Sequence, residues 1–342
     1  MNDVRVEDIR ALPKVELHRH LEGTARPGTV RELAEKHGRP EPDLSQWYDY
    51  DDLTDFLAVF GTVCSVLVDA DDYRRVAYES VEDAAAAGVI HTEMFFTPHE
   101  FLGRGVSFDT AWQGIEAGVR DGERDFGVSV RMIMDVDKAS GPGPALEQVE
   151  MCRERGDYLI GVGGDGEEAG VDDRALQPAF DLAARYGLHC TLHAGEFSAR
   201  SVADAIRYLG CERIDHGPLV LRDRELVAEA VDRRVAFTVC PSSDVIISKV
   251  YPEITDHPLS DMLASGLIVS LGSDDPALLG YDLADEYQTV LEVGLVDADG
   301  LRRIALDGVT ACWLPDDDKA RLRQRVEPAW AAATGLGSAR PQ

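Results

Sequence analysis

Eight short runs of β-forming apolar residues alternate with longer helical patterns, and this alternation constrains the fold more than any other feature of the chain. The runs cover residues 14–18, 88–96, 128–135, 158–162, 189–193, 213–216, 236–240 and 268–272. Helical patterns lie between them, over 73–87, 108–122, 144–155, 173–186, 201–209, 223–232 and 258–264. Eight strands that alternate with helices predict an α/β fold, a (β/α)8 barrel of the TIM type.

A doubly wound open sheet is the main alternative to the barrel. It would need a glycine-rich phosphate loop after its first strand, and the chain has His18-Arg19-His20 there. With 342 residues, 44% of them hydrophobic, the chain is long enough for one large barrel. We therefore expect a single domain over 1–342, with a flexible tail at about 335–342.

The long segment at about 24–87 separates the first two strands and is expected to be a helical insertion or lid. Phe56 and Phe60 are four residues apart and share one helical face. That face either packs a helix onto the barrel or forms an apolar wall over the mouth of a site.

Charge and cysteine content exclude several classes of function. Lys and Arg number 34 against 63 Asp and Glu, so the formal charge is −29, and nucleic acid and anionic membranes are not expected partners. The six cysteines are scattered with no C-x-x-C pair, which predicts buried thiols and no disulfide framework. No apolar signal segment or membrane-spanning run is present, so a cytoplasmic location is expected. The oligomeric state stays open.

His18 and His20 are candidate metal ligands. Residues i and i+2 of a strand point to one side, so the two imidazoles would face the same way. A lone His-x-His pair is weak evidence, because histidines also occur at exposed strand ends and in satisfied core positions.

Polar groups at the ends of other strands strengthen the prediction, since catalytic residues of such barrels lie at the carboxyl ends of the strands. The fifth run ends in His193 and is followed by Glu196, the sixth ends in His216, and the eighth leads into Asp274-Asp275. Read singly, Glu196 could be a first-turn helix carboxylate and Asp274 a helix cap. Taken together, the four strand ends predict a site.

Three imidazoles and one carboxylate are a typical hydrolytic zinc set. We therefore expect one zinc ion per chain, with the ligands His18, His20, His193 and Asp274. Zinc lowers the pKa of a bound water to about 7. Glu196 could then act as a general acid, His216 could orient or deprotonate the water, and Asp275 could bond a substrate group.

Five motifs in this order carry a family resemblance: Pro13-Lys-Val-Glu-Leu-His-Arg-His-Leu-Glu-Gly23, His193-Ala-Gly-Glu196, Arg213-Ile-Asp-His-Gly217, Cys240-Pro-Ser-Ser243 and Ser273-Asp-Asp-Pro276. The chain resembles the adenosine/adenine deaminase family of the amidohydrolase superfamily. The resemblance implies a (β/α)8 barrel, one zinc ion and hydrolytic removal of the 6-amino group of a purine.

The resemblance also implies a role for each matching residue, with Asp274 both a ligand and a water-orienting group. Glu196 would protonate N1 of the purine, and His216 would position the attacking water at C6. Asp275 would bond N7, the backbone N–H of Gly166 would meet N3, and His20 would face substrate as well as metal. Glu22 would lie near a ribose 5′-hydroxyl, and Phe56, Leu57 and Phe60 would form the apolar lid.

The chain departs from the family pattern at Gly163, where an aspartate is usual, at Asp244, where an asparagine is common, and at Phe197 after the catalytic glutamate. These positions leave the exact substrate open. The expected reaction is deamination of adenosine or 2′-deoxyadenosine to the inosine product and ammonia. Adenine, giving hypoxanthine, or a modified adenine nucleoside is the alternative substrate.

Glu22 is the basis for that order of substrates. On an extended chain, the Glu22 side chain would point to the same side as those of His18 and His20. It could therefore accept a hydrogen bond from a sugar hydroxyl, and it would repel a 5′-phosphate.

Two further functions compete with deamination. A two-metal amidohydrolase would need a bridging lysine or glutamate at the end of the fourth strand, where the chain has residues 161–166 and no lysine. A non-catalytic binding protein on the same barrel would predict erosion of the metal set, and none is visible.

Overall fold

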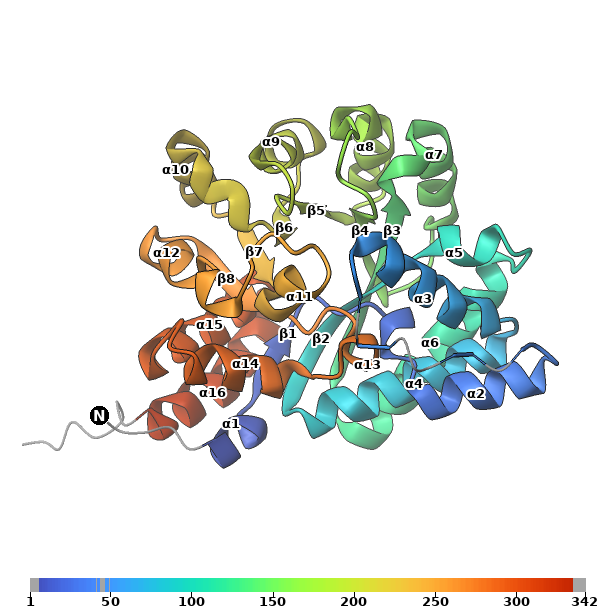
Figure 1. Ribbon diagram of the computed structural model, residues 1–342, viewed down its shortest axis with the longest axis horizontal. Helices are drawn as coiled ribbons and strands as arrows, with labels where there is room; N and C mark the ends of the chain where they lie inside the picture. Colours follow the sequence, from blue (N-terminus) through green and yellow to red (C-terminus); the bar gives the residue numbers. More distant parts are fainter. Residues whose placement is uncertain (1–5, 41, 44–46, 49, 335–342) are drawn as a thin grey trace, which may run out of the picture.

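The computed structural model describes residues 6–40, 42–43, 47–48 and 50–334, so the predicted tail at 335–342 lies outside the described residues. Eight parallel strands form one sheet in chain order. They are β1 Lys14–Glu16, β2 Val89–Phe96, β3 Ser129–Asp137, β4 Leu159–Asp165, β5 His189–Ala194, β6 Arg213–His216, β7 Ala236–Val239 and β8 Ile268–Leu271. A parallel bridge between Arg19 and Asp274 joins the chain beyond β1 to the chain beyond β8. The predicted (β/α)8 barrel is therefore confirmed, nearly closed and ringed by helices (Figure 1).

The helices surround the barrel, and most of them lie in the segments that connect one strand to the next. They are α1 Val6–Ala11, α2 Pro27–Lys36, α3 Leu53–Val66, α4 Ala70–Ala86, α5 Pro98–Leu102, α6 Phe108–Phe126, α7 Pro142–Met151, α8 Gln177–Arg185, α9 Ala199–Asp204, α10 Arg224–Arg233, α11 Pro241–Ile246, α12 Leu259–Ala264, α13 Pro276–Leu279, α14 Leu283–Glu292, α15 Ala298–Ala311 and α16 Asp316–Ala333. The sequence prediction named no helix after residue 264. The four that follow include α16, where Trp330 Nε1 donates to the Pro13 carbonyl, 2.9 Å away, beside the start of the barrel.

Several predicted elements begin or end differently in the structure, and two of them bear on the site. The first strand ends at Glu16 rather than at residue 18, and the ladder continues only as the isolated bridges of Arg19 and His20. His20 N–H bonds the Asp274 carbonyl and Leu21 N–H bonds the Phe95 carbonyl, so the chain stays joined to both neighbours until Leu21 turns into helical geometry. The predicted helix at 173–186 begins as a 3-10 turn, Asp173–Leu176, before α8.

In the outer ring of helices, α4 and α6 pack closely against each other. A Cβ atom on Gly114 would lie 2.2 Å from the Ala70 carbonyl oxygen, and one on Gly118 would lie 2.3 Å from that of Arg74. Only glycine at these positions lets the two helix backbones approach so closely. The N-terminus of α4 is fixed by a capping box between Asp69 and Asp72.

Buried charges cross the interior of the barrel near the amino ends of the strands. Arg213 on β6 donates to Glu93 on β2 over 2.6 Å, and neither side chain is exposed. The Arg213 guanidinium also lies 3.8 Å above the ring centre of Trp313.

All six cysteines are buried and free, as predicted. Within the described part of the chain, no helix is both long and apolar enough to cross a membrane.

Candidate metal centre and active site

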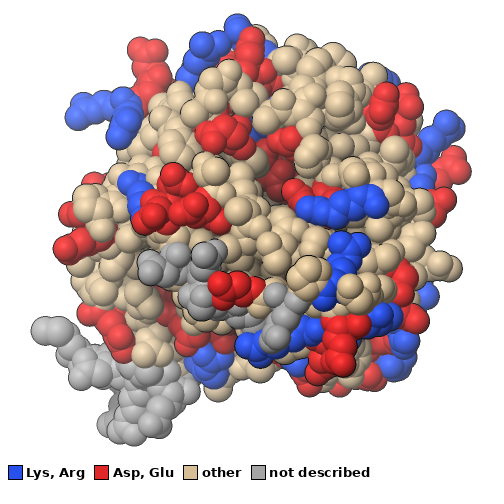
Figure 2. Space-filling model, turned by 45° about the vertical axis from the view of Figure 1, so that its right-hand side comes forward, with Lys and Arg blue, Asp and Glu red and all other residues tan. Residues whose placement is uncertain are grey.

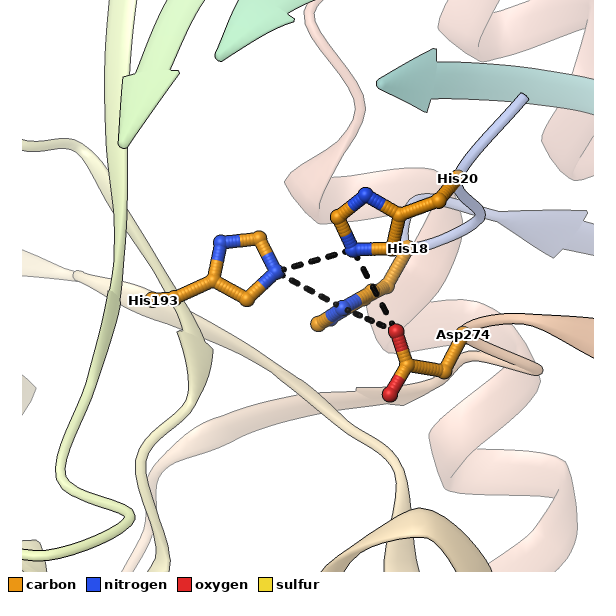
Figure 3. A group of neighbouring side chains, drawn as sticks. All are labelled: His18, His20, His193 and Asp274. Carbon is orange, nitrogen blue, oxygen red and sulfur yellow. Dashed lines mark hydrogen bonds and ion pairs between the residues drawn. The ribbon is translucent and has the colours of Figure 1, made fainter. Parts of the chain in front are cut away.

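Four side chains from three strand ends converge beyond the carboxyl end of the barrel (Figure 3). His20 Nε2 lies 3.1 Å from His193 Nε2, which lies 3.2 Å from His18 Nε2. Asp274 Oδ1 is 3.3 Å from Nε2 of both His18 and His20. All four residues are buried, and their donor atoms lie within 4.8 Å of one another.

The second ring nitrogens show how two of these imidazoles are oriented. His18 Nδ1 lies 3.0 Å from the Thr238 carbonyl oxygen, and His193 Nδ1 lies 3.2 Å from that of Gly164. A carbonyl accepts only from an N–H, so the proton is on Nδ1 and the Nε2 lone pair faces the cluster. Metal-bound histidines have this arrangement.

The charge state of the cluster also suits a cation. Burial would raise the pKa of Asp274, but hydrogen bonds from His18 and His20 outweigh burial and hold this pKa well below its usual range. Burial and the neighbouring imidazoles lower the pKa of His193 well below its usual value. An ionised carboxylate and a neutral imidazole are the forms that bind metal. Burial lowers the pKa of His20, but Asp275 and Asp274 outweigh burial and raise it well above the usual value, so a metal ion would have to displace a proton there. The donor atoms of the four residues fit a divalent metal ion.

Glu196 and His216 lie next to this cluster. His216 Nε2 is 3.9 Å from Asp274 Oδ2 and 4.0 Å from Glu196 Oε1. Burial raises the pKa of Glu196. Burial lowers the pKa of His216, but Glu196, Asp244 and Asp274 outweigh it and raise the value to about 10.

Asp244 and His257 support His216 from behind. Asp244 Oδ1 lies 3.0 Å from His216 Nδ1, and its Oδ2 lies 3.0 Å from His257 Nε2. Burial works against ionisation, but the two histidines outweigh it and lower the pKa of Asp244 to about 2. The sequence marked Asp244 only as a departure from the family, and nothing in the sequence pointed to His257.

Glu168 is a second residue that the sequence analysis missed. Its carboxylate accepts the backbone N–H groups of Glu196, Phe197 and Ser198, at 3.2, 3.3 and 2.7 Å. These bonds hold the turn between β5 and α9 that carries the Glu196 side chain. One feature of the sequence could have pointed to this role: Glu168 is an acidic residue just beyond the carboxyl end of a strand.

The cluster opens into a cavity of about 280 Å³. The lining residues fall into three groups: a polar floor with His20, His193, Glu196, His216, Asp274 and Asp275; an apolar side with Leu53, Phe56, Leu57, Phe60 and Ile247; and an acidic part with Glu100, Asp137, Asp165 and Glu167. Gly166 also lines it, with φ of +85°. The structure thus places Gly166, Asp275, Phe56 and Phe60, all predicted substrate contacts, on the cavity wall.

Glu22 does not lie where the sequence analysis expected it. Leu21 turns into helical geometry and Glu22 starts a 3-10 helix, so the assumption of an extended chain is wrong. The Glu22 side chain is buried and absent from the cavity wall, and its Oε1 accepts the Thr97 backbone N–H over 3.1 Å. Burial raises its pKa to about 7.

The fold and the site define a metal-dependent hydrolase built on a (β/α)8 barrel. The family model described as adenosine deaminase matches residues 13–329. The chain belongs to this adenosine deaminase family, and it is a hydrolase that acts on a C–N bond of a cyclic amidine, in purine deamination.

Three similar proteins illustrate the relationship. The adenine deaminase of Vibrio parahaemolyticus is 32% identical over 325 residues, 93% of this chain and 96% of that protein. The crystal structure of the adenine deaminase from Arthrobacter aurescens has a TM-score of 0.89 at 32% identity, covering 93% of this chain and 99% of that one. A zinc-bound amidohydrolase from Burkholderia ambifaria has a TM-score of 0.91 at 30% identity, covering 98% and 95%.

Proposed function

We propose that this protein is a zinc-dependent adenine deaminase, which hydrolyses adenine to hypoxanthine and ammonia. The observation that carries the proposal is the convergence of His18, His20, His193 and Asp274 at the floor of a small cavity, beside Glu196 and His216. The relatives with adenine deaminase activity in their names are 31–34% identical over more than nine-tenths of the chain.

The four converging side chains would hold one zinc ion, the metal bound in the Burkholderia amidohydrolase. Zinc lowers the pKa of a bound water to about 7 and so supplies a nucleophile near neutral pH. His216 is placed to orient the attacking water, because its Nε2 faces Asp274 while Asp244 fixes its Nδ1.

Glu196 supplies the proton that the ring must take up. Addition at C6 disrupts the aromatic ring, and a proton delivered to N1 at the same time absorbs the developing negative charge. Burial raises the pKa of Glu196, which favours the protonated form needed for this step.

Asp275 is suited to bind the N7 edge of the purine. It lies on the cavity wall, and its Oδ1 has no hydrogen-bond partner among the described residues. Burial and the neighbouring Asp274 raise its pKa well above the usual range, so Asp275 can donate an O–H to the lone pair of N7.

Adenine is favoured over adenosine for a structural reason as well as by the relatives. The residue expected to receive a ribose hydroxyl, Glu22, is buried and is not on the cavity wall, and its Oε1 already accepts the Thr97 N–H. A ribose would therefore lack that partner. The cavity of about 280 Å³ also lies at the small end of ligand sites, roughly 300–1,000 Å³.

The charge of the cavity argues against a 5′-nucleotide. Beyond the acidic residues of its floor, four more acidic side chains line it, from Glu100, Asp137, Asp165 and Glu167, and no Lys or Arg is among its described lining residues. Figure 2 shows acidic side chains around a hollow on this face of the molecule. A phosphate would be repelled in such surroundings.

The test is kcat/KM for adenine, adenosine and AMP, measured by ammonia release on protein of known zinc content. We expect adenine to be the preferred substrate and AMP to be the poorest. The Glu22→Gln variant should keep the ratio of adenine to adenosine turnover, because Glu22 does not face the cavity. Preferred turnover of adenosine by the wild type would contradict the proposal, and two tightly held metal ions per chain would favour a two-metal amidohydrolase instead.

A further inference from the structure

One buried carboxylate near the metal cluster has no part in the site described so far. Asp135, at the end of β3, is fully buried, and neither of its oxygens has a hydrogen-bond partner in the described part of the chain. An unpaired buried carboxylate is costly to maintain, so its presence calls for an explanation.

His20 lacks the support that the other two imidazoles have. His18 and His193 each direct Nδ1 at a backbone carbonyl, whereas His20 Nδ1 faces Asp135 Oδ2 across 4.0 Å. That separation is about 1 Å longer than an N–H···O hydrogen bond. A small tilt of the ring would close it, and a metal-bound histidine almost always donates its second N–H to a carboxylate, carbonyl or water.

The position of Asp135 also gives a reason for the glycine at position 163. Asp135 on β3 pairs in register with Gly163 on β4. A Cβ atom built on Gly163 would lie 2.0 Å from Asp135 Oδ1. The Asp135 carboxylate therefore occupies the space that a side chain at 163 would enter, and the two cannot be present together without displacement.

We propose that Asp135 on β3 is the residue that orients the metal ligand His20, and that Gly163 on β4 leaves free the space that the Asp135 carboxylate occupies. Asp135 is a positioning residue, because it acts on the metal and substrate only through His20. The inference rests on the proposed zinc site, and it adds to that site a fifth residue that sets the affinity for the metal.

The test is zinc affinity, measured by competition with a chromogenic chelator on the purified full-length chain. Asp135→Ala should bind zinc about 10–100-fold more weakly than the wild type, the usual effect of losing the partner of a metal-bound histidine. Asp135→Asn keeps one oxygen acceptor and should lose less. Asp173→Ala is the matched control: it removes another buried carboxylate, one that accepts the Ser201 hydroxyl and lies off the cavity wall, and it should lower the melting temperature but leave zinc affinity unchanged.

A reciprocal exchange tests whether the two strand positions are equivalent. In Asp135→Ala/Gly163→Asp the carboxylate moves from β3 to β4, and zinc affinity should rise above that of Asp135→Ala. Gly163→Asp alone places two carboxylates in one space and should lower the melting temperature of the metal-free protein. A folded double variant that binds zinc no better than Asp135→Ala would refute the equivalence.

The outcomes separate this inference from the proposed function. If the wild type binds no zinc, the proposed metal centre fails. If the wild type binds one zinc ion and Asp135→Ala binds it equally well, the role of Asp135 is wrong while the metal centre stands. Should Asp135→Ala fail to fold, Asp135→Asn carries the test, and unchanged zinc affinity in that variant would overturn the inference.

Discussion

At the scale of single residues, the acid role proposed for Glu196 requires that the side chain carry a proton. Burial in the cavity raises its pKa and supplies that condition. Glu196→Gln keeps the shape of the side chain but cannot deliver a proton, so we expect turnover to fall about 10²–10⁴-fold, while zinc content stays at one per chain. Steady-state kinetics beside metal analysis checks both statements, and near-normal turnover would remove Glu196 from the mechanism.

In the proposed metal centre, Asp274 combines the roles of zinc ligand and water-orienting group. Its Oδ1 faces His18 and His20, while its Oδ2 accepts the Ser243 hydroxyl over 2.5 Å and faces His216. Asp274→Ala should therefore lose both zinc retention and activity, because a ligand and a water-orienting group disappear together. Metal content after dialysis and turnover in excess zinc are the two measurements. Full activity with full zinc in this variant would show that Asp274 is not a ligand.

At the scale of elements, α3 lies over the cavity and forms its apolar side. Phe56 and Phe60 pack with ring centres 6.0 Å apart, and both line the cavity. Their spacing predicted a shared face, and here that face is turned toward the site. If the purine packs against it, Phe60→Ala removes apolar contact worth about 1.5–3 kcal/mol, which corresponds to a fall in kcat/KM of about 10–100-fold.

Val63 on the same helix is the control for this prediction. It is buried but lines no part of the cavity. Val63→Ala should lower the melting temperature through a core cavity and leave kcat/KM for adenine near the wild-type value. Equal losses of kcat/KM in the two variants would mean that α3 acts only through stability.

At the scale of the whole molecule, the Glu93–Arg213 pair joins β2 to β6 across the barrel. Burial works against the ionised form of Glu93, but Arg213 and His91 outweigh burial and lower the pKa from 4.5 to about 2. A carboxyl group with a lowered folded pKa contributes stability that is fully present above pH 4.5 and is lost as pH falls toward 2. The shift corresponds to about 3 kcal/mol at neutral pH.

We therefore expect the free energy of unfolding of the metal-free protein to decline between pH 4.5 and pH 2, and to decline less in Glu93→Gln. Denaturant unfolding at several pH values measures both slopes. Glu93→Gln should also be less stable at pH 7, because Arg213 loses its charged partner in the interior. Identical slopes in the two proteins would assign the acid sensitivity to other carboxyl groups.

The sequence by itself determined the architecture and the set of residues that converge in the candidate metal site. Strand and helix periods are local properties, and a barrel places the carboxyl ends of all its strands at one face. Knowing that His18, His193, His216 and Asp274 lie at or just beyond the carboxyl ends of strands was therefore enough to predict that they meet. The eight strands occur within a few residues of their predicted ranges for the same reason.

Only the tertiary structure decided the interactions between side chains from distant segments. Glu22 is not on the cavity wall, because the chain turns into helical geometry at Leu21, which no local pattern predicted. Asp135 lies against Gly163 because β3 and β4 pair in that register. A shift of one residue would turn Asp135 to the other face of the sheet. Such contacts depend on the register and close packing of the whole barrel, whereas the strand-end rule depends only on where each strand stops.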